Sequence, residues 1–153
     1  GQAPGDGRAT PADTAAALAA IRRPDAPLHT IDLPGPTGES NRLSVHARAP
    51  LLCLGPSPSQ AMAQAEAVRR LGGLAVEAPG LPAAALETLH GFSGALFWGD
   101  AARPFAQALA RRTGPILPLI TGLPDAGHVT QERHVCIDTT ASGGNAQLLA
   151  GAA

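Results

Sequence analysis

Short apolar runs alternate with segments of helical periodicity from residue 50 onward. The apolar runs, each with the length of a buried strand, are 51–55, 74–78, 95–99, 116–121 and 134–138. The segments with apolar residues at helical spacing are 59–73, 83–91 and 101–114. This alternation predicts a three-layer, Rossmann-like α/β domain with a mainly parallel sheet over residues 50–132. Pro118 has no backbone N–H, so its strand is expected at an edge of the sheet or at a bulge.

The first 49 residues are predicted to differ in character from this domain. Residues 1–10 carry few apolar groups and are expected to be disordered. Residues 11–49 are predicted to hold a short helix, capped by Thr10 or Thr14, and then a Pro/Gly-rich connector with a strand near Leu43 and Val45. Prolines fix φ and glycines permit turns that other residues cannot make, so a defined shape is expected for the connector. Its shaping residues are Pro34, Gly35, Pro36, Thr37, Gly38, Glu39 and Asn41.

The charge balance argues against nucleic acid as a partner, and the hydropathy argues against insertion into a membrane. A chain of 153 residues is long enough for one domain with its own core. Its 11 basic residues are all arginines, scattered among 12 acidic ones, so no basic stripe is available for nucleic acid. No apolar run approaches the roughly 20 residues that span a bilayer, and the first residues lack a signal-peptide pattern. A cytoplasmic protein without membrane insertion is therefore expected.

The cysteines and histidines do not follow a pattern typical of catalysis or metal binding. Cys53 and Cys136 both lie inside apolar runs, which favours buried, reduced thiols over a disulfide or a nucleophile. The five histidines share no ligand spacing, so no metal site is predicted. We therefore expect no catalytic residue, no metal and no bound cofactor in this chain.

One turn between a strand and a helix keeps nucleotide binding open as an alternative. Ligands of open parallel sheets bind beyond the carboxyl ends of the strands, and the Gly55–Ser59 turn follows a predicted strand and opens a helix, with Ser59 as the expected cap. A lone glycine stands where a dinucleotide fingerprint needs three, and Pro56 and Pro58 remove two backbone donors. The favoured interpretation is a turn without a ligand. The alternative is a nucleotide (NAD)-binding or independently enzymatic domain that uses this turn.

Two polar motifs near the ends of the chain resemble those of a known family. They are LPGPTGESNRL (33–43) and ERHVCIDTTASGGNAQLL (132–149), with LLCLGPSPSQAMAQ and ALFWGD between them. From about residue 28 onward, the chain resembles the C-terminal region of the bacterial bifunctional enzyme proline utilization A. In that family a flavin-dependent proline dehydrogenase and an NAD-dependent glutamate-semialdehyde dehydrogenase lie upstream, so FAD and NAD are implied for those domains.

The resemblance implies a non-catalytic role for this chain. Longer family members carry an extra aldehyde-dehydrogenase-like domain, and residues 133–153 would be the C-terminal motif strand and tail that follow it. This motif is implied to pack against the upstream dehydrogenase domains, with a second protomer as a further partner, and to help enclose the passage through which the semialdehyde moves. The implied contact residues are Arg133, Asp138, Thr139, Thr140, Gly143, Gly144, Asn145, Leu148 and Leu149. Neither Cys53 nor Cys136 matches the reactive-cysteine loop of an aldehyde dehydrogenase.

Overall fold

The computed structural model describes residues 7–138, and the chain divides into two units. The first unit comprises Gly1–Arg23 and Ala47–Thr130, and the second comprises Pro24–His46 and Gln131–Ala153. Among the described residues, all helices belong to the first unit.

The first unit is built on a parallel sheet of very short strands. They are β3 (Leu51–Cys53), β4 (Ala75–Glu77), β5 (Gly94–Leu96) and β6 (Leu119–Ile120), in the spatial order β4-β3-β5-β6. Every neighbouring pair is parallel, so the predicted parallel sheet is confirmed. The apolar run at 116–121 yields only the two residues of β6, because Pro118 cannot donate to a ladder. Pro118 directly precedes this edge strand, in agreement with the edge position expected for it.

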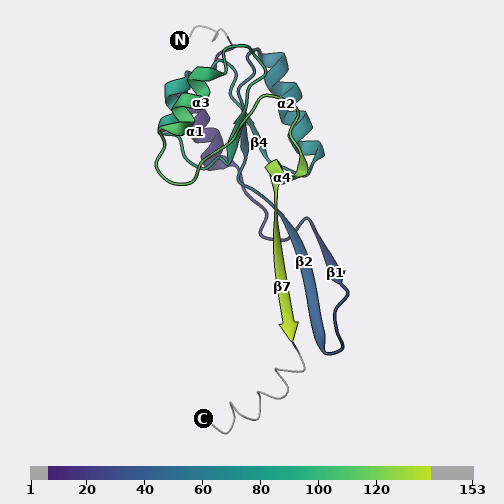
Figure 1. Cartoon of the computed structure of the whole chain (residues 1–153). Coiled ribbons are helices and arrows are strands. Elements are labelled where there is room, and N and C mark those ends of the chain that lie inside the picture. The colour runs from purple at the N-terminus through teal and green to yellow at the C-terminus, as the bar shows by residue number, and fades with distance from the viewer. Residues whose placement is uncertain (1–6, 139–153) are drawn as a thin grey trace. The chain divides into compact units, whose positions relative to one another are not determined.

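The helical segments lie on both sides of this sheet. They are α1 (Pro11–Ala20), α2 (Pro58–Arg70), the 3-10 helix η1 (Ala83–Glu87), α3 (Arg103–Ala110) and the one-turn helix α4 (Ala126–Val129). Figure 1 shows α2 on one side of β4, with α1 and α3 on the other. The segment 83–91 was expected to be a longer α-helix, and only its first residues form η1.

The alternation of side chains along each strand divides the core into two clusters. Leu52 of β3 contributes to the cluster that includes Leu18 of α1 and Leu109 of α3. Its neighbours in β3, Leu51 and Cys53, point to the other face and contribute to the cluster of α2. Strands buried on both faces explain why the sequence shows continuous apolar runs rather than alternation.

Side-chain caps fix where the first two helices begin. Of the two caps expected, Thr10 is the one that begins α1, by accepting a hydrogen bond from the backbone N–H of Asp13 at 3.1 Å. The expected cap of α2, Ser59, was wrong. Ser57 occupies that position and forms a reciprocal capping box with Gln60, and Pro58 follows as the first helical residue.

Two consecutive arginines fasten the end of α3 to η1. The guanidinium of Arg112 donates to the main-chain oxygens of Leu86 and Leu89 and lies 4.7 Å from the centroid of the Phe92 ring. Arg111 forms a 3.0 Å ion pair with Glu87. The bonds of Arg112 thus give partners to one main-chain oxygen in η1 and one just after it.

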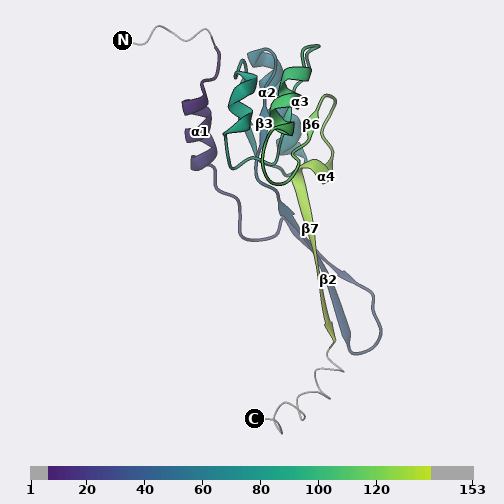
Figure 2. The ribbon, with the colours of Figure 1, turned by 60° about the vertical axis from the view of Figure 1, so that its left-hand side comes forward.

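The second unit contains an antiparallel hairpin, which the sequence did not predict. Strands β1 (His29–Leu33) and β2 (Glu39–Ala47) pair antiparallel, from His29 opposite Val45 to Leu33 opposite Asn41. The strand β7 (Thr130–Asp138) pairs with the other edge of β2, and Figure 2 shows β7 and β2 side by side. The strands expected near Leu43 and at 134–138 are thus confirmed, and both are longer than the patterns indicated.

The packing of Gly73 provides a test of the first unit. A Cβ atom at this residue would lie 2.5 Å from Val129 Cβ and 2.9 Å from Val68 Cγ1. Gly73→Ala should therefore lower the free energy of unfolding by about 1–3 kcal/mol, as overpacking does in other cores. The measurement is the urea midpoint, with Gly122→Ala as control, because no atom lies within 4 Å of a Cβ there. Equal stability of the two variants would contradict the packing described.

Candidate functional site

The Gly55–Ser59 turn lies where a parallel sheet offers a ligand site. It connects the carboxyl end of β3 to the first turn of α2, and Gly55 has a φ of +93°, a conformation that favours glycine. A Cβ atom on Gly55 would lie 2.7 Å from the backbone nitrogen of Ser57. The glycine is therefore required by the tightness of the turn itself.

A buried glutamine occupies the hydrogen-bonding groups of Gly55. Gln64 on α2 is fully buried, with 0% of its surface exposed. Its Oε1 accepts a hydrogen bond from Gly55 N–H at 3.0 Å, and its Nε2 donates to Gly55 O at 2.8 Å. The backbone N–H of Trp98 donates to the same oxygen at 2.9 Å. A ligand that approached Gly55 would find both of its main-chain groups already bonded.

The backbone N–H groups of Ser57 and Gln60 are also bonded locally. Ser57 N–H donates to Gln60 Oε1 at 3.2 Å, and Gln60 N–H donates to Ser57 Oγ at 3.2 Å. Pro56 and Pro58 have no N–H to offer. The turn therefore lacks the cluster of unpaired N–H groups with which a helix N-terminus binds phosphate.

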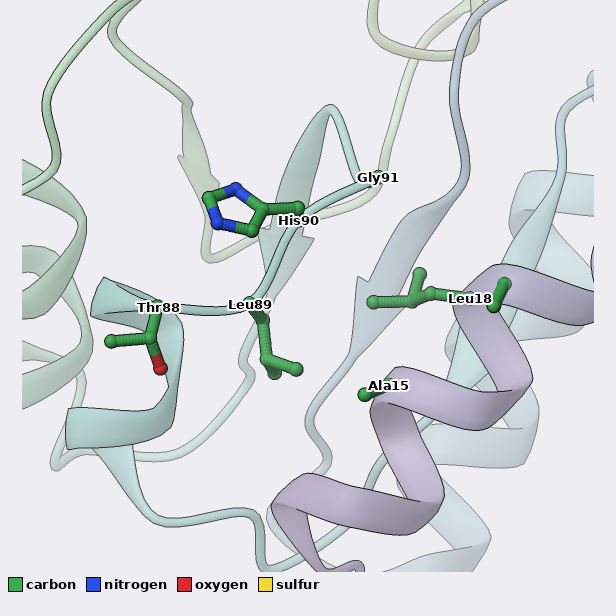
Figure 3. Close-up of a pocket in the computed structure, with 7 residues that line it drawn as sticks. Ala15, Leu18, Thr88, Leu89, His90 and Gly91 are labelled. Atoms are coloured by element: carbon green, nitrogen blue, oxygen red, sulfur yellow. The ribbon is translucent and has the colours of Figure 1, made fainter.

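A hollow beside α1 has a mostly apolar lining. It lies between α1 and the segment that follows η1, and Figure 3 shows Leu18 and Leu89 lining it. The imidazole of His90 extends away from α1 in the same view. This hollow offers packing surface but brings no pair of polar groups together for chemistry.

The two cysteines have different environments. Burial raises the pKa of the Cys53 thiol to about 12, while the positive charge of Arg69 lowers it and the negative charge of Glu77 raises it. Cys53 therefore remains a protonated thiol at neutral pH. The expectation that Cys136 is buried was wrong. It is exposed on β7, and its thiol donates to the carboxylate of Glu39 at 3.3 Å. The strand that contains it is covered less than its apolar sequence suggested.

The described part of the chain offers neither a metal site nor a membrane helix. Within residues 7–138, no three side chains of His, Cys, Asp or Glu come together as metal ligands. No helix among these residues is both long enough and apolar enough to cross a bilayer.

The predicted contact residues fall mainly outside the described residues. Arg133 is exposed on β7, and Asp138 is the last residue of that strand. The other predicted contacts lie beyond residue 138 and so outside the described part; they are Thr139, Thr140, Gly143, Gly144, Asn145, Leu148 and Leu149.

The connector residues form the turn between β1 and β2. Pro36 O accepts from Glu39 N–H at 3.0 Å, and Gly38 has a φ of +88°. A Cβ atom at Gly35 would lie 2.6 Å from Asn41 Nδ2, so the Asn41 side chain packs directly against the glycine. A main-chain hydrogen bond and a glycine in the left-handed region therefore form this turn.

Exposed apolar side chains on the second unit were missed in the sequence. Ile31 is 45% exposed and Leu33 is 38% exposed on β1, while Val135 and Ile137 on β7 are 48% and 51% exposed. The two apolar residues of each strand are two positions apart, and alternate residues of a strand share a face. This spacing could have indicated an apolar face on each strand. Groups of exposed apolar side chains are typical of interaction surfaces.

Comparison with known proteins relates the chain to one bifunctional protein. The bifunctional protein PutA of Rhizobium meliloti is 32% identical over 150 residues, covering 78% of this chain and 12% of the relative. PutA of Salmonella typhimurium is 32% identical over 143 residues, covering 76% of this chain and 11% of the relative. The chain therefore spans about a tenth of the length of these curated relatives and is related to a region of PutA. No protein-family model matches it.

Solved structures of PutA show a weaker similarity. A crystal structure of a Bradyrhizobium japonicum proline utilization A mutant has a TM-score of 0.41 and 25% identity, covering 60% of this chain and 13% of that one. A second mutant of the same protein has a TM-score of 0.40 and 24% identity. The relation to PutA rests on the sequence alignments.

Replacement of Gln64 tests how the turn is closed. Gln64→Leu keeps the volume but leaves the N–H of Gly55 buried without its partner, so the free energy of unfolding should fall by about 1–3 kcal/mol. Amide hydrogen exchange at Gly55 should accelerate at the same time. Gln107→Leu is the matched control, because Gln107 lies on the exposed surface of α3. Unchanged stability and exchange in Gln64→Leu would mean that the turn does not depend on this side chain.

Proposed function

We propose that this chain is a non-catalytic C-terminal domain of a bifunctional enzyme that converts proline to glutamate. The alignment with PutA supports a place within a longer polypeptide of this kind, because the chain matches about a tenth of the length of each relative. The enzyme's two oxidations would be carried out by upstream domains that bind FAD and NAD. In this proposal the first unit is a Rossmann-like, three-layer domain, and the whole enzyme is a cytoplasmic bacterial protein.

The bonding of Gln64 to Gly55 is the observation that carries the non-catalytic role. A nucleotide-binding sheet uses the main-chain groups at this turn, and here a side chain of the same unit holds both groups of Gly55. The buried thiol of Cys53, with its pKa raised to about 12, supports the same conclusion, because a nucleophilic cysteine needs a thiolate.

The second unit would supply the contacts to the rest of the polypeptide. The exposed apolar residues of β1 and β7 would lose water on packing against the upstream aldehyde dehydrogenase region or a second protomer. Residues 133–153 would complete that interface and help enclose the passage between the two active sites. The role of the domain is then to stabilise the dehydrogenase and to retain the semialdehyde.

The alternative is an NAD-binding or independently enzymatic domain. The position of the Gly55–Ser59 turn favours it, since the turn follows the carboxyl end of a central parallel strand. Nucleotide binding would require Gln64 to release Gly55.

Titration with NAD distinguishes the two functions. Addition of NAD to the 153-residue chain should leave its melting temperature unchanged under the proposed function. A ligand at 100 times its dissociation constant adds about 2.7 kcal/mol of stability, so binding would be visible as a rise in melting temperature. A saturable rise with amide shifts at Gly55 and Ser57 would overturn the non-catalytic role.

Truncation tests the proposed contribution to channelling. Deletion of residues 139–153 from the longer enzyme should produce a lag in NADH formation from proline, because the semialdehyde must first accumulate in bulk solution. Flavin content and dehydrogenase activity on added semialdehyde serve as controls for folding. The same deletion should leave the melting temperature of the isolated chain nearly unchanged. An unaltered time course in the longer enzyme would contradict the role in channelling.

A further inference from the structure

A hollow lies at the amino ends of the parallel strands, whereas the Gly55 turn lies at their carboxyl ends. Its volume is about 360 Å³, within the range of small-molecule pockets. The residues that line it precede β3, β5 and β6 or belong to α4, and all of them are in the first unit. They are Arg48, Ser93, Pro115, Ile116, Leu117, Pro118, Gly127 and His128.

Arg48 is held in this hollow by main-chain oxygens. Its Nε donates to Gly127 O at 3.1 Å and to Thr130 O at 2.8 Å, and its backbone N–H donates to Val129 O at 2.9 Å. Within the described part of the chain, no acceptor is bonded to its two terminal nitrogens. These bonds hold the Nε end of the guanidinium in place, and the N–H groups of its two terminal nitrogens are available to bind another molecule.

His128 adds a second donor to the same lining. The backbone N–H of Asp125 donates to His128 Nδ1 at 3.0 Å, which leaves the ring proton on Nε2 when the imidazole is neutral. When the ring is charged, Nε2 also carries a proton, so a donor is present in both states. The Asp125 carboxylate accepts from His128 N–H at 3.1 Å at the start of α4, and it also lies 3.2 Å from His128 Nδ1. Arg48 is therefore the main source of positive charge in the lining. The Ser93 hydroxyl donates to Ala49 O at 2.6 Å and adds no donor.

The other side of the hollow is apolar and open to solvent. Ile116 is 94% exposed, an unusual position for a large aliphatic side chain, and Leu117 is half-buried beside it. Pro115 and Pro118 restrict the backbone on either side of these two residues. A ligand that contacts Ile116 would remove apolar surface from water.

We propose that this hollow binds a small carboxylate that carries an aliphatic group. A planar guanidinium matches a carboxylate with two parallel hydrogen bonds, and the apolar rim selects against inorganic anions. The carboxylate would lie against Arg48 and His128, with its aliphatic group on Ile116 and Leu117. A free organic acid and the C-terminus of a peptide ending in an aliphatic residue both present this chemistry. All residues of this site belong to the first unit, and none of them belongs to the Gly55–Ser59 turn.

Titration of the nitrogen-labelled 153-residue chain with isocaproate is the first test. Saturable amide shifts should appear at Ser93, Ile116, Gly127 and His128, with a dissociation constant on the order of millimolar. Isocaproamide, the neutral analogue, should bind at least about tenfold more weakly, because a carboxylate–arginine pair is lost. Acetate should also bind more weakly, because it lacks the aliphatic group. N-acetylglycyl-leucine tests the peptide source; tighter binding of this probe would identify a peptide C-terminus, and tighter binding of isocaproate a free acid.

Two variants separate this site from nonspecific anion binding. Ile116→Ser should weaken isocaproate by several-fold without affecting the fold, and Leu123→Ser is its matched control, since Leu123 is 78% exposed and does not line the hollow. Arg48→Gln should abolish saturation, with Arg103→Gln as control. If Arg48→Gln fails to fold, the affinity of the Ile116→Ser variant for isocaproate still tests the proposal. The proposal would be overturned if neither carboxylate saturated the chain, or if isocaproamide bound as tightly as isocaproate. It would also be overturned if the Ile116→Ser variant bound isocaproate as tightly as the wild-type chain.

Discussion

The parallel sheet of the first unit has strands of only two or three residues, and the rest of that unit depends on this constraint. So short a ladder leaves the main chain at both ends of each strand to find other hydrogen-bond partners, because buried polar groups without partners are costly. Main-chain groups provide some of them, as in the bonds from Leu54 N–H to Leu96 O and from Ser93 N–H to Pro50 O. Side chains provide others, from Gln64 to Gly55, from Trp98 to Gly122 and from Ser93 to Ala49. Arg48 and Arg112 bond to main-chain oxygens outside the parallel strands, at Gly127 and Thr130 and at Leu86 and Leu89. Within residues 7–138, no buried side-chain nitrogen or oxygen lacks a partner.

This bonding gives the two edges of the sheet different chemical properties. At the carboxyl edge, Gln64 and Trp98 use the main-chain groups of Gly55, and Trp98 Nε1 donates to Gly122 O at 2.8 Å. At the amino ends, the Arg48 side chain bonds to main-chain oxygens through Nε alone, and its two terminal nitrogens remain available as donors. Ligands of open parallel sheets usually bind beyond the carboxyl ends of the strands, where here the main-chain groups of Gly55 are bonded to Gln64. The hollow that contains Arg48 lies at the amino ends.

The strands of the second unit are less covered than those of the parallel sheet. Its antiparallel strands are longer, yet β1 and β7 are edge strands with apolar side chains exposed to solvent. Exposed edges and apolar side chains are typical of a surface that is covered in a larger assembly. The relation to a region of PutA, with a chain that spans about a tenth of each relative, is consistent with a piece that functions against other parts of a longer polypeptide.

The sequence by itself indicated the parallel sheet, a start of α1 at Thr10 or Thr14, an edge or bulge position next to Pro118 and the resemblance to proline utilization A, because each depends on local pattern or residue type. It did not indicate that Ser57 rather than Ser59 caps α2, that residues 34–38 turn a hairpin, or that Cys136 is exposed. The bonding of Gln64 to Gly55 and the placement of Arg48 and His128 in the lining of one hollow were decided only in the tertiary structure. Hydrogen bonds between segments far apart in the chain leave no periodic signal, since they depend on which loops the folded sheet brings to the same edge.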